Sequence, residues 1–345
     1  MTSAPIRGLC EPIVSALRER ATDVTVWDDI AAEPTVADFR SALAAARAAG
    51  VDTVIGIGGG SALDVAKLVA AFAKSAQDIR DAFGIDKLVS RETWLACLPT
   101  TAGTGSEVSP NAILLDEAEQ LKKGVISRHL VPDVAIVDPS LTVTAPPAVT
   151  GATGIDALTH CIEAYANKLS HPTVDLFALE GARLIAENLP TAYLDGRNLA
   201  ARSGVALGSL YGGLCLGPVN TGAVHALSYP LGGEFHVPHG VANAVLLCPV
   251  LEFNLPAAPE RYAEVAVAIG AARAAGALET ARAGVELLRR LTQSVGIPPR
   301  LRDLGVPQSA IDRLATAAMT VTRLLDRNPR PMTHEDAVAI YRKAL

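Results

Sequence analysis

Short runs of apolar residues alternate with longer helical patterns over the first part of the chain. Four such runs predict buried strands: DVTVW, VDTVIGIG, TWLACLP and DVAIVDP. Near-continuous apolar strands are typical of a parallel sheet that is covered on both faces. The segments ADFRSALAAARAAG and ALDVAKLVAAFAKS lie between them and have helical spacing. This alternation predicts an α/β, Rossmann-like fold with a parallel sheet.

The pattern changes near residue 148, where strand signals become rare and helical patterns dominate. Five segments carry these patterns: GIDALTHCIEAYANKL, TVDLFALEGARLIAENL, ARSGVALGSLYGGLCLG, RYAEVAVAIGAARAAG and ETARAGVELLRRLTQSVG. A chain of 345 residues is also longer than a single core usually supports. The sequence therefore predicts an α/β domain over residues 1–148 and an all-α domain over residues 149–345, with a cleft between them.

The composition favours a soluble protein that acts on a small molecule. The formal net charge is -6 and no basic stretch stands out, which argues against nucleic acid or an anionic membrane as partner. Five cysteines without CxxC spacing indicate reduced, buried thiols and a cytoplasmic location. We find no apolar run of the ~18 residues that a membrane span needs, and no signal peptide at the start.

A glycine-rich turn joins the second predicted strand to the helix after it. In IGIGGGSALDVAK, Gly59 and Gly60 allow a ligand to approach the backbone closely. Ser61 is expected to cap the helix, and Asp64 to complete a capping box. Asp64 is also a candidate cofactor-binding residue of this turn. Unpaired N–H groups at such a helix start favour an anion such as pyrophosphate. The motif is not GxGxxG, so a capped turn without a ligand explains the same residues.

A second turn of hydroxyl and glycine residues, LPTTAGTGSEVS, follows the strand TWLACLP. It contains Thr100, Thr101 and Thr104. In an open parallel sheet, ligands bind beyond the carboxyl ends of the strands, and both glycine turns leave strands at that edge. Two such loops together favour a dinucleotide, although an ordinary loop between strand and helix remains the alternative.

Four residues from three segments suggest a metal site. Asp156 and His160 are four apart in GIDALTHCIEAY, which places them on one face of a helix. His225 and His239 bound the stretch HALSYPLGGEFHVPH, whose glycines and proline allow the chain to return. One carboxylate and three imidazoles suit a divalent cation. Taken alone, the first pair is better explained by a helix contact, and His236 is either a further imidazole or a solvated residue.

Taken together, these motifs resemble the iron-containing (group III) alcohol dehydrogenases, which include lactaldehyde reductases and maleylacetate reductases. Five motifs occur in the order of that family: GGGSALDVAK, PTTAGTGSEVS, VPDVAIVDPSLT, GIDALTHCIEAY and HALSYPLGGEFHVPHGVANA. The resemblance covers nearly the whole chain. It implies a dinucleotide-binding first domain, a helical second domain of dehydroquinate synthase-like architecture, and a metal in the cleft.

The resemblance also implies roles for particular residues. The metal ligands would be Asp156, His160, His225 and His239. Pyrophosphate would lie against Gly59, Gly60 and Ser61, and the nicotinamide and ribose against Thr100, Thr101 and Thr104, with Lys123 and Leu141 also approaching the cofactor. The expected activity is reversible hydride transfer between NAD or NADP and a small alcohol, aldehyde or hydroxy acid. Fe²⁺ is the expected metal and Zn²⁺ the alternative, in a homodimer.

The chain departs from the family pattern in three places. Relatives usually begin with a longer segment that includes the first strand of the sheet. Ser3 lies near the position where many NAD-using relatives have an acidic residue, so the choice between NAD and NADP stays open. Tyr229 replaces a further histidine, so a proton relay would use His236, Tyr229 or water.

Other activities fit less well. Maleylacetate reductases commonly have asparagine where this chain has Asp156 and act without a metal. A non-redox enzyme of the dehydroquinate-synthase type needs several basic residues at its site, and Lys and Arg are sparse between Ala145 and Pro249. A catalytically silent protein of this fold would be expected to lose a ligand, and all four are present.

Overall fold

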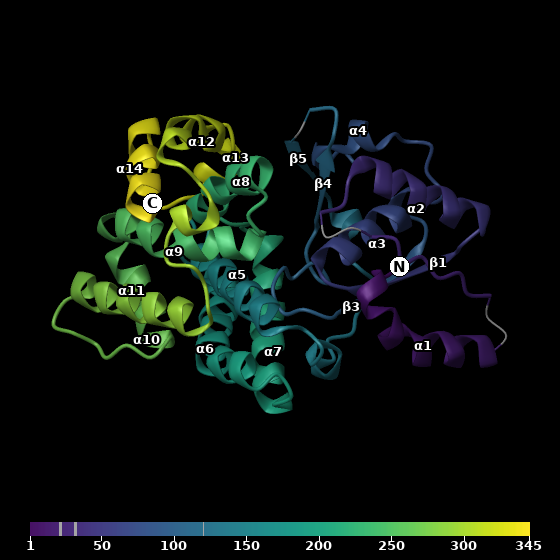
Figure 1. Ribbon diagram of the computed structural model, residues 1–345, viewed down its shortest axis with the longest axis horizontal. Helices are drawn as coiled ribbons and strands as arrows, with labels where there is room; N and C mark the ends of the chain where they lie inside the picture. Colours follow the sequence, from purple (N-terminus) through teal and green to yellow (C-terminus); the bar gives the residue numbers. More distant parts are fainter. Residues whose placement is uncertain (21–22, 31–32, 120) are drawn as a thin grey trace. The chain divides into compact units, whose positions relative to one another are not determined.

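The computed structural model describes residues 1–20, 23–30, 33–119 and 121–345. These residues form two compact units. The α/β unit comprises Met1–Thr101 and Ser106–Thr142, and the helical unit comprises Ala102–Gly105 and Val143–Leu345. The first is purple to blue in Figure 1 and the second mainly teal to yellow. The units therefore change at residue 142, against 148 in the sequence analysis, and four residues of the second glycine turn belong to the helical unit.

The first sheet of the α/β unit is parallel, as predicted. Its strand order is β1-β3-β6, with β1 at Thr53–Gly58, β3 at Trp94–Pro99 and β6 at Val134–Ala135. The run DVAIVDP thus gives a shorter strand than expected, although backbone hydrogen bonds to β3 continue on both sides of β6.

Helices cover both faces of this sheet. Leu95 and Cys97 belong to the core that β3 shares with α3 (Gly60–Phe72) and α2 (Val36–Ala48). Ala96 and Leu98 point the other way and pack with apolar residues of α1 (Arg7–Glu19). The alternation explains why the strand sequence is apolar throughout.

The expected strand DVTVW is not formed. Residues 23–27 have no strand pairing, and one backbone hydrogen bond reaches them, from Thr2 N to Trp27 O at 2.9 Å. Met1 in turn exchanges two backbone hydrogen bonds of 2.9 Å with β1. Met1 and Thr2 make too few contacts to join residues 23–27 to the sheet as a strand. The side chains of Val24, Val26 and Trp27 still pack against the cores of the α/β unit.

A second sheet was missed by the sequence analysis. Its order is β2-β5-β4, with β2 at Gly84–Ile85, β5 at Leu121–Ile126 and β4 at Asn111–Asp116. β4 and β5 form an antiparallel pair, and β2 runs parallel to β5. The β5 sequence LKKGVI combines two lysines with a glycine, which weakens the strand pattern.

The remaining helices form the helical unit, apart from the short α4 (Ile79–Ala82) of the α/β unit. Their bounds are α5 Pro147–Ala166, α6 Pro172–Leu194, α7 Leu199–Leu216, α8 Ala223–Phe235, α9 His239–Asn254, α10 Pro259–Ala268, α11 Ala277–Ser294, α12 Ile311–Met319, α13 Thr322–Leu325 and α14 His334–Ala344. α5, α6 and α7 lie side by side, and α9 packs on α5, α8 and α14 (Figure 1). α10 ends earlier than its pattern predicts because Gly270 adopts φ +102°.

Two helical stretches are long and apolar enough to span a membrane, although we expected no such run from the sequence. These stretches are Leu199–Leu216 and His239–Ala257, and they qualify by length and composition only. However, 56% and 61% of these stretches are buried inside the protein, as in the core helices of a soluble protein. The two helices are therefore weak evidence for a membrane span.

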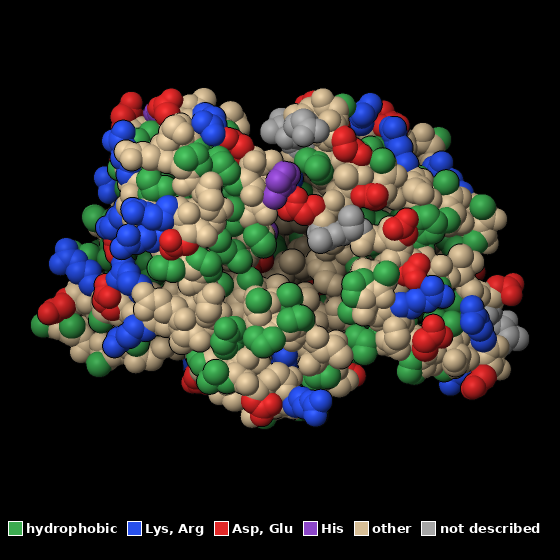
Figure 2. All heavy atoms as spheres, viewed as in Figure 1, with side chains coloured by type: hydrophobic (Ala, Val, Ile, Leu, Met, Phe, Trp, Pro, Cys, Tyr) green, Lys and Arg blue, Asp and Glu red, His purple; other side chains and the backbone are tan. Residues whose placement is uncertain are grey.

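Charged side chains of both signs are interspersed over the face drawn in Figure 2, and Lys and Arg gather at its left end, where α11 and α14 lie. Within these helices, Arg289 and Lys343 both pair with Glu252 of α9. These two basic side chains are thus partly neutralised by a carboxylate of the same unit. All five cysteines are free and buried, as expected.

Candidate active site

Helix α5 presents a buried carboxylate and an imidazole on one face. Asp156 and His160 are one helical turn apart, and Nε2 of His160 lies 3.9 Å from Oδ1 of Asp156. Asp156 is 2% exposed and His160 4%. The packing of α6, α7 and α9 on α5 explains this burial.

Helices α8 and α9 bring two further imidazoles to the same oxygen. His225 is on the first turn of α8, and its Nε2 lies 3.5 Å from Oδ1 of Asp156. His239 is the first residue of α9, with Nε2 3.7 Å from that oxygen. The chain turns between the two helices at His236, whose φ of +53° ends α8. The structure thus brings together all four residues that the sequence suggested as ligands.

The four donor groups fit a divalent cation. Donor atoms about 2.1 Å from a metal in tetrahedral geometry lie roughly 3.4 Å from one another. The three Nε2–Oδ1 distances of 3.5, 3.7 and 3.9 Å are close to this value. Asp156, His160 and His225 by themselves also form a compact group of candidate metal ligands. One carboxylate with three imidazoles leaves a divalent cation with a net positive charge, and both Fe²⁺ and Zn²⁺ accept these donors.

The protein around these groups favours an ionised Asp156. Burial alone would raise the pKa of this carboxyl, but the rings of His160, His239 and His225 hold it below its usual range. Burial lowers the pKa of His160. For His225, the carboxylates of Glu163 and Asp156 outweigh the effect of burial and raise its pKa to about 10. A cation at the site therefore competes with a proton on His225.

Two residues that the sequence analysis missed support the ligands. Glu163 Oε2 lies 2.6 Å from Nδ1 of His225. Asn243 Nδ2 donates to Oδ1 of Asp156 at 2.6 Å and lies 3.1 Å from Nε2 of His225. The signal for both was helical spacing, because Glu163 is seven residues after Asp156 and Asn243 is four after His239.

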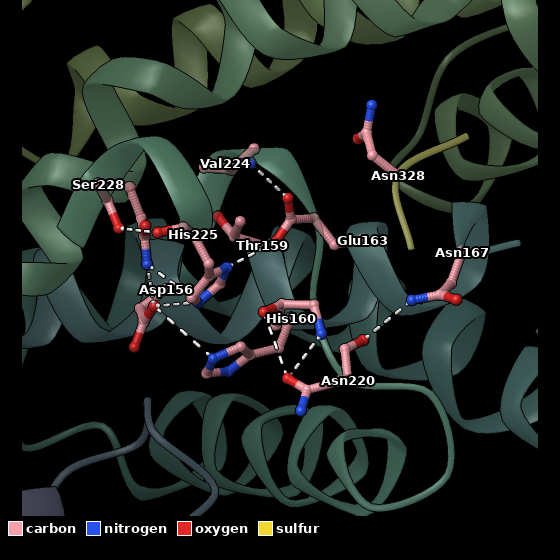
Figure 3. Close-up of polar contacts among 12 residues, drawn as sticks. Asp156, Thr159, His160, Glu163, Asn167, Asn220, Val224, His225, Ser228 and Asn328 are labelled. Atoms are coloured by element: carbon pink, nitrogen blue, oxygen red, sulfur yellow. Dashed lines mark hydrogen bonds and ion pairs between the residues drawn. The ribbon is translucent and has the colours of Figure 1, made fainter. Parts of the chain in front are cut away.

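Figure 3 shows how these groups lie around His225. Asp156 and His160 are on one side of the ring, and Glu163 of the same helix is on the other. The rings of His160 and His225 are stacked, with centroids 4.7 Å apart. Each nitrogen of the His225 ring thus faces a different carboxylate.

The two residues suggested for proton transfer are placed differently. The ring of Tyr229 lies 6.0 Å from that of His239, and its hydroxyl accepts a hydrogen bond of 3.2 Å from Arg323. His236 is exposed at the end of α8. Tyr229 is therefore beside a candidate ligand, whereas none of the contacts described for His236 places it at the site.

The first glycine turn starts α3, but not with the expected cap. The N-cap is Gly59, with no side-chain hydrogen bond, and Gly60 begins the helix, so Ser61 lies within its first turn. A Cβ at Gly59 would lie 3.4 Å from Oγ1 of Thr101. Thr100 N also donates to Gly58 O at 2.9 Å. The helix therefore starts at a glycine, which lies beside Thr100 and Thr101 of the second turn.

Asp64 has a structural role in place of the predicted capping box. Its Oδ1 accepts from Ser106 Oγ at 2.5 Å and its Oδ2 from Ile113 N at 2.9 Å. Lys67, one turn later, is fully buried and donates to the carbonyls of Ser106, Ser109 and Asn111. Burial raises the pKa of Asp64 and lowers that of Lys67, and each opposes the shift of the other. Both side chains tie α3 to the end of the second glycine turn.

The other suggested cofactor residues are dispersed. Thr104 lies in the segment that belongs to the helical unit. Lys123 lies on β5 and pairs with Glu119 at 2.6 Å and Asp116 at 3.1 Å. Leu141 packs against the core between α1 and the first sheet. Their roles toward a cofactor stay predictions.

Comparisons with known proteins agree with this fold. Residues 1–139 match the family described as iron-containing alcohol dehydrogenase, and residues 150–345 match its C-terminal part. The chain belongs to the iron-containing alcohol dehydrogenase family. It is an oxidoreductase that acts on alcohols or aldehydes, so the expected family and architecture are confirmed.

Individual relatives cover almost the whole chain. Long-chain-alcohol dehydrogenase 1 of Geobacillus thermodenitrificans is 41% identical over 98% of this chain and 86% of its own. The crystal structure of a 1,3-propanediol oxidoreductase has a TM-score of 0.96 at 36% identity, covering 100% of this chain and 91% of its own. The structure of sulfoacetaldehyde reductase from Bifidobacterium kashiwanohense, solved with NAD⁺, has a TM-score of 0.90 at 29% identity. The match covers 99% of this chain and 89% of the reductase chain.

Proposed function

We propose that this chain is a metal-dependent, NAD(P)-linked alcohol dehydrogenase or aldehyde reductase for a small alcohol or hydroxy acid. The observation that carries the proposal is the convergence of three imidazole nitrogens on one oxygen of Asp156, inside the helical unit. Substitution of asparagine at this position, the pattern of maleylacetate reductases, would remove the negative charge from the set. Its retention favours a metal-dependent reaction.

In this proposal Asp156, His160, His225 and His239 hold the cation. When bound, the cation supplies Lewis acidity to a substrate oxygen and the nicotinamide supplies the hydride chemistry. The ionised Asp156 balances part of the positive charge in the buried site. Tyr229, beside His239, is our candidate for a side chain that holds a proton near the site, and its hydroxyl accepts a hydrogen bond from Arg323.

The first glycine turn is the proposed site of the cofactor pyrophosphate. The N-cap residue of α3 is Gly59, which has no side-chain cap hydrogen bond, and the positive end of the helix dipole at such a glycine turn favours an anion. Thr101 lies against Gly59 and lines the same turn. The relative solved with NAD⁺ supports a nicotinamide cofactor, and we propose NAD or NADP.

A turnover assay with defined metal content tests this function. Protein stripped by a chelator and reloaded with Fe²⁺ or Zn²⁺ is given primary alcohols and either NAD⁺ or NADP⁺, and reduced nicotinamide is measured. We expect activity that disappears on stripping and returns on reloading. Equal activity in the stripped protein would overturn the metal-dependent proposal. A separate assay for phosphate release from a phosphorylated sugar acid, without net change in NAD⁺, tests the alternative of a non-redox enzyme of the dehydroquinate-synthase type.

We also propose that the enzyme works as a cytoplasmic homodimer, with neither nucleic acid nor a membrane as partner. Five buried free cysteines support a reducing compartment. The dimer rests on the family resemblance. Light scattering after gel filtration measures the mass directly, and a monomer at working concentration would overturn it.

A further inference from the structure

We propose that Glu163 is a positioning residue that sets both the orientation and the tautomer of His225, so that the affinity of the site for its cation depends on Glu163. The inference rests on the proposed metal-dependent function. The observation behind it is a carboxylate that is bonded on both oxygens to the same turn of α8.

The two oxygens of Glu163 have separate partners. Oε2 lies 2.6 Å from Nδ1 of His225, and Oε1 accepts the backbone N–H of Val224 at 2.6 Å. Glu163 is 7% exposed and His225 3%, so neither contact is open to water. A Cβ at Gly222 would lie 3.2 Å from Oε1, which shows how closely the start of α8 approaches this carboxylate.

Glu163 also provides the cap that α8 lacks in its own sequence. The N-cap residue of α8 is Gly222, which has no side chain to bond the first N–H groups. The carboxylate from α5 accepts one of these N–H groups and carries the charge that a helix N-terminus favours. The backbone of α8 and the ring of His225 are thus fixed by one side chain.

The contact with Glu163 also determines which ring nitrogen can bind a cation. An ionised carboxylate only accepts hydrogen bonds, so Nδ1 of His225 must carry a proton. In the neutral imidazole Nε2 then has the free lone pair, and Nε2 is the atom that faces Asp156 at 3.5 Å. This arrangement of carboxylate, histidine and cation is known to orient ligands and to raise their basicity.

The variant Glu163→Gln separates this role from simple space filling. Glutamine has nearly the same shape, but it offers one acceptor and one donor where Val224 N–H and His225 Nδ1–H both need acceptors. If the NH₂ group of the glutamine faces Nδ1 of His225, Nδ1 must accept, so the ring proton moves to Nε2, which can then no longer bind a cation. If the NH₂ group faces Val224 instead, it meets the backbone N–H of Val224, and these two donors repel each other at the start of α8.

Asp175 of α6 provides a matched control in the same unit. Its carboxylate accepts from Arg261 Nη1 at 2.7 Å and from Ser170 at 2.7 Å, and no described contact joins this carboxylate directly to a candidate ligand or to Glu163. Asp175→Asn should therefore lower stability without changing metal binding. The comparison distinguishes a loss of ligand positioning from a general loss of stability.

The experiment is a titration of metal-free protein with Zn²⁺ in competition with a chromophoric chelator. We expect wild type and Asp175→Asn to bind one ion with the same affinity, and Glu163→Gln to bind about 10- to 100-fold more weakly. The rise in thermal midpoint on adding Zn²⁺ should shrink only in Glu163→Gln, because ligand stabilisation follows affinity.

The outcomes separate this inference from the proposed function. If wild type binds no Zn²⁺ or Fe²⁺, the metal-dependent function is overturned together with the inference. If wild type binds and Glu163→Gln binds equally well, or if both variants weaken binding alike, only the role of Glu163 is overturned. Should Glu163→Gln not fold, Glu163→Asp replaces it. This variant keeps the charge but shortens the reach, and an unchanged affinity would again contradict the inference.

Discussion

Nδ2 of Asn243 lies 2.6 Å from Oδ1 of Asp156, the oxygen on which three imidazole nitrogens converge. Asn243 is fully buried, and its own Oδ1 has no hydrogen-bond partner among the residues that the structure describes. Its amide therefore points its hydrogens at the atoms that would hold a cation. The amide of Asn243 thus donates a hydrogen bond that offsets part of the cost of burying the charged carboxylate of Asp156.

Replacing Asn243 by leucine should affect the metal-free protein more than the loaded one. Without metal, loss of the amide donor leaves Asp156 less well satisfied and should cost about 1–3 kcal/mol of unfolding free energy. With a cation bound, the carboxylate has another partner, so the loss should be smaller. Denaturant unfolding with and without Zn²⁺ measures both values, and equal losses would contradict this account of the contact.

Lys67→Met should destabilise the α/β unit strongly. The substitution leaves three buried carbonyls and the carboxylate of Asp64 without their cation. Breaking a buried charge pair in this way costs about 3–5 kcal/mol. The exposed Lys87→Met is the control and should be nearly neutral. Similar unfolding free energies for the two variants would show that the buried ammonium does not hold the loop.

Gly105→Ala should be destabilising for two separable reasons. Gly105 has φ +61°, and a Cβ there would lie 2.3 Å from Cα of Gly213 in α7. Gly50 has the same φ but nothing within 4 Å of its Cβ, so Gly50→Ala measures the backbone term alone, about 1–2 kcal/mol. We expect Gly105→Ala to exceed Gly50→Ala by about 1–3 kcal/mol of overpacking. Equal unfolding free energies would mean that α7 moves freely to make room.

The Asp175–Arg261 ion pair predicts part of the acid sensitivity of the helical unit. Burial would raise the pKa of Asp175, but the hydrogen bonds from Arg261 and Ser170 hold it below its usual value. A carboxyl with a depressed folded-state pKa contributes stability above its unfolded pKa of about 3.9, and this is lost as the pH falls further. The unfolding free energy of Asp175→Asn should therefore fall less steeply below about pH 4 than that of wild type. If the unfolding free energies of wild type and Asp175→Asn fell in parallel with pH, the Asp175–Arg261 pair would not be a source of the acid sensitivity.

Much of the fold followed from local patterns. The runs VDTVIGIG and TWLACLP form β1 and β3 because both faces of that sheet are covered, which makes the strands apolar throughout. DVTVW failed because a strand also needs a partner backbone, and among the described residues the one backbone N–H that donates to this segment is that of Thr2. β5 was missed because its two lysines interrupt the strand pattern. In the fold Lys122 pairs with Glu33, 89 residues earlier in the chain, and Lys123 pairs with Asp116 of the neighbouring strand β4.

The ligand set could be suggested from sequence, but its supports could not. Asp156, His160, His225 and His239 are residue types with metal chemistry, so their spacing carried information. Glu163 and Asn243 act through distances that arise only when α5, α8 and α9 pack together. Likewise Asp64 fitted a capping box equally well by its position, and only the fold shows that it bonds Ser106 instead.

The most direct test of the central claim is the metal content of purified protein, measured by elemental mass spectrometry on wild type, His225→Ala and the exposed-site control His171→Ala. The account predicts close to one iron or zinc per chain in wild type and in His171→Ala, and almost none in His225→Ala. As much metal in His225→Ala as in wild type would contradict the assignment of the site.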